Sequence, residues 1–224
     1  MRWYWFHAIF FLSCLLTPLS AQESKPLATQ YLECTRNAIG NVVGSRTERT
    51  PVFAAKDKAR AHGVVAAVGS AGACTNISSV YIAAPQRPFT LVFRQVAEPL
   101  PDGTVYDGNG IQAIRWSPSG KRLLIEVSRW TWGTDSTWNS KYMLLNRDEN
   151  ALRQIMPEEA IWKRFNTPCQ MSVTSRGWTD DSHIEFEVAP SQTYDVEGVP
   201  DPEPPCVEHT TEFTFDVVSQ TLRP

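Results

Sequence analysis

The segment that decides the fold runs from Trp116 to Val127 and reads Trp-Ser-Pro-Ser-Gly-Lys-Arg-Leu-Leu-Ile-Glu-Val. Pro118 presets the first corner of a turn, and Gly120 can take the left-handed backbone conformation that a short hairpin loop requires. After the turn, Leu123, Ile125 and Val127 alternate with a more polar set of positions, which is typical of a strand with one buried face. The segment therefore predicts a β-hairpin corner followed by a half-buried strand.

Two weaker copies of this segment flank it, one at 51–63 and one at 177–188. Their aromatic anchors Phe53, Trp116 and Trp178 are separated by 63 and 62 residues. A repeat at a near-constant spacing indicates similar structural units that bury their faces against one another. We therefore expect three units, which span about 51–100, 111–156 and 170–224.

Each unit is expected to hold four strands, because a second pair of apolar segments follows each hairpin after a variable loop. The whole of 51–224 is then a single all-β domain. Residues 157–165 begin with a proline followed by acidic residues and end with basic ones, a pattern that predicts one short helix. Residues 22–50 are weakly patterned and form an N-terminal segment.

The first 21 residues have the order of a secretory signal peptide. Arg2 precedes a mostly apolar run from Trp3 to Leu16, and small residues end at Ala21. An uncleaved membrane anchor and a lipoprotein cleaved before Cys14 are the alternatives. No other apolar run approaches the roughly 20 residues that a membrane span needs, so we expect a periplasmic or secreted protein.

Four cysteines follow the signal peptide: Cys34, Cys74, Cys169 and Cys206. An even number in an exported chain predicts disulfides, and four cysteines allow three pairings. We favour the pairs of sequence neighbours, Cys34–Cys74 and Cys169–Cys206. The histidines are scattered and no Cys-x-x-Cys occurs, so neither a metal site nor a cofactor is expected.

The strongest candidate for ligand binding is the tryptophan-rich segment 130–138. Flat apolar rings edged by hydroxyls and a carboxylate suit the faces of sugars and also protein interfaces. The competing interpretation is that the first rings extend the preceding strand and pack between units. The candidate ligand-binding residues are Trp130, Trp132, Asp135 and Trp138.

Other classes of function have little support in the sequence. The chain carries 21 basic and 24 acidic residues, a balance that argues against nucleic-acid partners. It has no Gly-x-Ser-x-Gly nucleophile motif, and no catalytic residue is assigned. We expect a non-enzymatic binding or scaffold protein with a protein or glycan partner. The alternative is a carbohydrate-active or hydrolytic protein that holds substrate with the segment 130–138.

The Trp-Ser-Pro-Ser-Gly-Lys segment resembles the TolB/WD40-like β-propeller repeats of bacterial periplasmic proteins, most closely over 111–127. Those repeats carry an aromatic residue, then Ser-Pro-Asp-Gly-Lys and an apolar strand; here Ser119 replaces the usual aspartate. The resemblance implies propeller blades, but three units are fewer than the roughly four to eight blades of a closed propeller. An open or incomplete propeller is expected. Its open sheet edges would pair with a second copy or be capped by 23–49 and the long loops.

Overall fold

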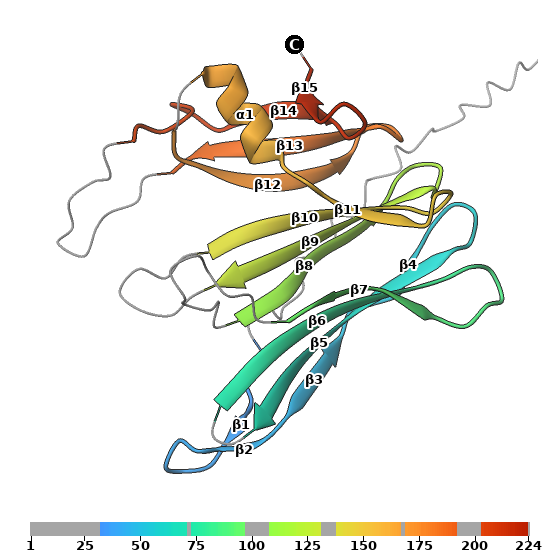
Figure 1. The fold of residues 1–224 in the computed structure, drawn as a ribbon, viewed down its shortest axis with the longest axis vertical. Helices are drawn as coiled ribbons and strands as arrows, with labels where there is room; N and C mark the ends of the chain where they lie inside the picture. The colour runs from blue at the N-terminus through green and yellow to red at the C-terminus, as the bar shows by residue number, and fades with distance from the viewer. Residues whose placement is uncertain are drawn as a thin grey trace, which may run out of the picture.

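The computed structural model describes residues 32–70, 73–96, 108–130, 138–166, 169–191 and 203–223. Within these residues the chain is mostly β, with four antiparallel sheets and one helix. Figure 1 shows the three larger sheets stacked face to face in chain order. None of the helical structure in these ranges is long and apolar enough to cross a membrane.

The first of the stacked sheets contains five strands, not the four expected. Its strands are β3 (Arg46–Arg49), β5 (Arg60–Ser70), β6 (Ala73–Ala83) and β7 (Thr90–Gln95), with β4 (Phe53–Ala54) also paired to β5. Pro51 has no N–H to donate to the ladder, so the edge strand is divided into β3 and β4. The sheet therefore begins before residue 51, inside the expected N-terminal segment. The small sheet of β1 (Thr35–Arg36) and β2 (Val42–Gly44) precedes it.

The second and third sheets are four-stranded meanders, so the expectation of four-stranded units fits them and fits the first sheet only loosely. The second sheet contains β8 (Gly108–Trp116), β9 (Arg122–Trp130), β10 (Trp138–Asn146) and β11 (Ala151–Ile155). The third contains β12 (Met171–Trp178), β13 (His183–Pro190), β14 (Thr211–Asp216) and β15 (Thr221–Leu222). The predicted helix is confirmed as α1 (Pro157–Phe165), which connects the two sheets.

The β8–β9 corner is the turn that its sequence predicts. The N–H of Gly120 donates to the carbonyl of Ser117 at 2.8 Å, and the N–H of Ser117 donates to the carbonyl of Arg122 at 2.9 Å. Gly120 has φ +79°, and a Cβ on it would lie 2.9 Å from the Cβ of Ala55 in the neighbouring sheet. Glycine is therefore needed both for the backbone conformation and for close packing of two corners.

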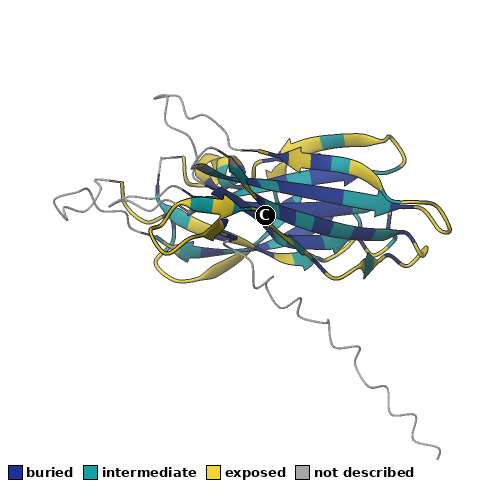
Figure 2. Cartoon of the chain, turned by 90° about the horizontal axis from the view of Figure 1, so that it is seen from below, coloured by how far each residue is buried: buried dark blue, intermediate teal, exposed yellow. Residues whose placement is uncertain are grey.

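The middle sheet is buried on both faces, so the prediction of a half-buried β9 is wrong. Leu123, Ile125 and Val127 pack into a core shared with the first sheet. Leu124 and Tyr142 pack into a second core shared with the third sheet and α1. A strand between two sheets has no solvent face, so the polar positions of its alternation are buried as well. Figure 2 shows buried positions along the strands and exposed positions gathered at the hairpin ends.

The repeat spacing has a direct structural counterpart in two indole hydrogen bonds. The Nε1–H of Trp116 donates to the carbonyl of Phe53 at 3.0 Å, from the second sheet to the first. The Nε1–H of Trp178 donates to the carbonyl of Arg115 at 3.1 Å, from the third sheet to the second. In both cases donor and acceptor are 63 residues apart. Each tryptophan anchor therefore joins its own sheet to the preceding one.

Both favoured disulfides are present. Cys34–Cys74 ties the N-terminal segment to β6, and Cys169–Cys206 ties the start of the third unit to the segment before β14. Beside the second bridge, the N–H of Cys206 donates to the carbonyl of Gln170 at 2.8 Å. Their sequence separations of 40 and 37 residues correspond to about 4 kcal/mol each in a chain-entropy account of the unfolded state.

Candidate functional site: a cleft between two hairpin corners

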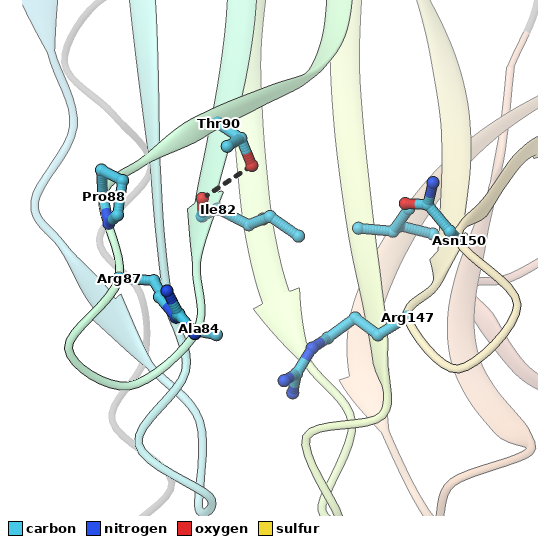
Figure 3. A pocket seen from close by; sticks show the side chains of 8 residues that line it. Ile82, Ala84, Arg87, Pro88, Thr90, Arg147 and Asn150 are labelled. Carbon is cyan, nitrogen blue, oxygen red and sulfur yellow. Dashed lines mark hydrogen bonds between the residues drawn. The ribbon is translucent and has the colours of Figure 1, made fainter.

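An open cleft lies between the β6–β7 hairpin of the first sheet and the β10–β11 hairpin of the second (Figure 3). Its volume is about 420 Å³, which is within the roughly 300–1,000 Å³ range of small-ligand sites. The lining combines an apolar floor with cationic and amide groups. The lining residues are Ile82, Ala84, Arg87, Pro88, Thr90, Leu145, Arg147 and Asn150.

Arg147 is held in place by contacts to two other hairpin corners. Its Nη1 lies 2.7 Å from Oδ2 of Asp57 and 2.7 Å from the carbonyl oxygen of Gly120, and donates to both. Its guanidinium also lies over the ring of Trp116, 5.4 Å from the centroid, which adds a cation–π contact. The hydrogen bond from Arg147 lowers the pKa of Asp57, so this carboxylate stays ionised. These contacts therefore hold the guanidinium of Arg147 in a fixed orientation at the cleft.

Arg87 lies on the opposite side of the cleft, in the turn between β6 and β7 (Figure 3). Its backbone is fixed, because its N–H donates to the carbonyl of Ala84 at 3.0 Å and its own carbonyl accepts from Arg60 at 3.2 Å. Within the described residues, no hydrogen bond or ion pair engages its exposed guanidinium. A planar guanidinium with free donors is suited to a carboxylate or phosphate.

The charged lining groups of the cleft are suited to binding an anion. Arginines stay protonated at any physiological pH and cannot act as a base. The hydroxyl of Thr90 donates to the carbonyl of Ile82 at 3.3 Å, and no base lies against it among the lining residues. The charge of Arg147 is already paired with Asp57. The guanidinium of Arg87, unpaired among the described residues, lies above an apolar floor and therefore fits a ligand with one anionic group and an apolar body.

A second polar group lies between the middle and third sheets, but it is inaccessible. Glu126 on β9 is 2% exposed. Its carboxylate accepts from Ser175 Oγ at 2.6 Å and pairs with Arg115 at 3.6 Å. Burial raises the pKa of Glu126, although Ser175 and Arg115 partly oppose this effect. These contacts join β8 and β9 to β12, so they hold two sheets together and do not form a substrate site.

Glu158 on α1 extends this buried group. Burial raises the pKa of Glu158 to about 7, and Glu126 adds to the shift while Arg129 opposes it. The nearby Tyr142 hydroxyl donates to the carbonyl of Val173 at 2.8 Å. Glu158 is therefore a titratable group of the helix that interacts electrostatically with charged residues of the middle sheet.

The structure describes only part of the predicted tryptophan site. Trp130 is 1% exposed, and a Cβ on Gly108 would lie 2.3 Å from its indole atoms. Its ring is therefore part of the core and offers no face to a ligand. Trp132 and Asp135 lie outside the described residues. Trp138 pairs with Trp130 through the backbone of β9 and β10, and its side chain is not described. The sugar-binding alternative depends on these three residues.

The two cleft arginines were not identified from the sequence, because each lies in a segment that reads as an ordinary turn. Arg87 precedes a proline, and Arg147 begins a run of polar residues. The partner of Arg147, Asp57, is 90 residues away. The repeat could have supplied a signal, since it predicts that successive hairpin corners lie together.

Within the described ranges, no group of three or more histidine, cysteine, aspartate or glutamate side chains is arranged to hold a metal ion. The chain was compared with protein-family models, with curated proteins and with solved structures, and none of them matches.

Proposed function

We propose that this chain is an exported, non-enzymatic binding protein that holds its ligand in the cleft between the first and second sheets. The observation that carries the proposal is the pair of arginines, one oriented by Asp57 and one with its donors available. The ligand is an apolar chain that ends in a carboxylate. Its apolar part lies over Ile82 and Leu145, and its carboxylate accepts hydrogen bonds from Arg87.

Export is part of the same proposal. Residues 1–21 act as a signal peptide, and the mature protein is periplasmic or secreted. The two disulfides support this location, because such bonds persist in oxidising compartments. The likeness of the hairpin corners to TolB/WD40-like repeats supports an open propeller-like scaffold, whose successive corners form the cleft.

The test is calorimetric binding of a matched pair of peptides. An acetylated tripeptide of apolar residues with a free carboxylate is compared with the same tripeptide amidated. We expect the acid to bind and the amide to bind at least about tenfold more weakly, since a hydrogen bond to a charged group contributes about 1.5–3 kcal/mol. Arg87→Gln should remove this preference. Arg164→Gln, an exposed change on α1, is the control and should retain it.

Equal binding of acid and amide to the unaltered protein would contradict the proposal. So would an undiminished preference in Arg87→Gln. Arg87 is exposed, and its guanidinium forms no hydrogen bond or ion pair within the described residues, so this variant should fold normally. Its thermal unfolding is measured alongside to establish that.

A further inference from the structure

The two ends of the sheet stack carry faces of different chemistry. Figure 1 shows the first and third sheets at opposite ends of the stack, with the middle sheet between them. A Cβ on Gly63 would lie 2.5 Å from Ile111 of the middle sheet, so this residue faces inward. Since side chains alternate along a strand, His62 and Val64 face outward, away from the stack.

The outward face of the first sheet is apolar and basic; we call it the basic end face. The other outward residues of β5 lie on the same face. The strand register adds the residues of β3 and β6 that lie across from them, and the residues of β7 that lie across from those of β6. Its apolar members include Leu91, which is 50% exposed, and Val68, which is 38% exposed. Its charged members are all arginines: Arg49, Arg60 and Arg94. In the described part of this face there is no carboxylate.

The outward face of the third sheet is mainly acidic, although Arg176 and Arg223 also lie on it; we call it the acidic end face. Ile184, Phe186 and Val188 of β13 are fully buried against the middle sheet, so the alternate residues Glu185 and Glu187 face outward. Glu187 lies directly across from Glu212 on β14. Two like charges in directly opposed positions destabilise a sheet. Arg176 forms an ion pair with Glu187 and so relieves this repulsion only in part.

We propose that the basic end face of one copy docks on the acidic end face of a second copy. The pairing sets Arg49 and Arg94 against Glu187 and Glu212. It covers the exposed apolar residues and separates the opposed carboxylates with guanidinium groups. Contact between two basic end faces would bring like charges together and is disfavoured. The contact is head to tail, so repetition closes a ring or extends a chain of copies.

This contact differs from the packing inside the chain. Within the chain, an indole of the second sheet and one of the third each donate to the preceding sheet, as Trp116 does to Phe53. The first sheet has Phe53 at the anchor position, and phenylalanine has no N–H to donate to a preceding copy. Charge pairs therefore replace the indole bond at this interface. The docking is correspondingly weak and sensitive to salt.

The experiment is sedimentation of the full chain from low micromolar to submillimolar concentration. We expect association in low salt that falls at least about tenfold in about 0.5 M NaCl, where the Debye length is only a few ångströms. The variants Arg49→Glu/Arg94→Glu and Glu187→Arg/Glu212→Arg should each be monomeric alone. When the two variants are mixed, they should associate one to one, because each face then meets a face of opposite charge on the other variant.

The control is Lys56→Glu/Arg164→Glu, which reverses two exposed charges in the turn between β4 and β5 and on α1, outside the strands that form the two end faces. It should associate like the unaltered protein. A protein that is monomeric at every concentration would overturn the proposal. So would charge-swap variants that self-associate normally, or a mixture that stays monomeric. Circular dichroism of each variant confirms that the sheets are intact. The peptide-binding test of the cleft is independent of this outcome.

Discussion

Asp181 accepts a hydrogen bond from the backbone N–H of Ser119, with 2.8 Å between Oδ1 and the nitrogen. Both residues stand three positions after the tryptophan anchor of their own repeat, Trp178 and Trp116. Equivalent positions of two hairpin corners are thus bonded directly to each other. This hydrogen bond is the main reason that the pKa of Asp181 is lowered. The corner of the repeat is therefore an interface between sheets as well as a turn.

Asp181→Ala should destabilise the protein modestly. The change removes a charge-assisted hydrogen bond at a partly exposed corner, so we expect a loss of about 0.5–1 kcal/mol in the free energy of unfolding. Urea denaturation measures it. Asp148→Ala is the matched control, because the carboxylate of Asp148 forms an exposed ion pair with Lys121, and such pairs contribute little. Equal losses in the two variants would argue against a special role for the corner bond.

Trp178→Phe and Trp116→Phe should each lower the free energy of unfolding by about 1–2 kcal/mol. Phenylalanine keeps the apolar ring but removes the N–H, which leaves a carbonyl of the preceding sheet without its donor. The two bonds lie at different sheet interfaces, so the losses should add in the double variant. Unchanged midpoints in chemical denaturation would show that the indole bonds do not hold the sheets together.

Stability should fall as pH rises from about 4.5 to 7, and Glu158 should be a main cause. Its pKa is raised from 4.5 to about 7 in the folded protein. The folded state therefore binds the proton more tightly than the unfolded state, and stability is lost as that proton leaves. The full effect is up to about 3 kcal/mol. Glu158→Gln should flatten the pH profile of unfolding, whereas Glu149→Gln in the exposed turn between β10 and β11 should leave it unchanged.

Loss of either disulfide should destabilise the fold by about 2–4 kcal/mol. Cys34→Ser/Cys74→Ser and Cys169→Ser/Cys206→Ser test the bridges separately by thermal unfolding. The first bridge holds the N-terminal segment against β6, so its loss should also raise amide hydrogen exchange in β1 and β2. An equal rise in amide exchange in all strands of that variant, relative to the unaltered protein, would contradict a local tethering role.

Much of the fold could be predicted from local patterns. Pro118 and Gly120 predicted the corner, the charges at the ends of 157–165 predicted α1, and cysteine spacing favoured the observed pairs. The error in β9 has a simple cause. The alternation of polar and apolar residues predicted that Glu126 faces solvent. In the structure Glu126 is buried instead, because Arg115 and Ser175 pair with its carboxylate. The extra strand β3 was missed because its four residues, Arg-Thr-Glu-Arg, lie in the weakly patterned segment 22–50.

The sequence by itself determined the repeat and the turns within it, because these depend on residues that are close along the chain or on a fixed spacing. It favoured one of three cysteine pairings, and the tertiary structure decided among them. Tertiary structure alone decided which corners meet and what their side chains do there. Asp57 and Arg147 are 90 residues apart, and their pairing depends on how the sheets stack. The same stacking buried Trp130, exposed Arg87 beside a cleft, and left a basic face at one end of the molecule and an acidic face at the other.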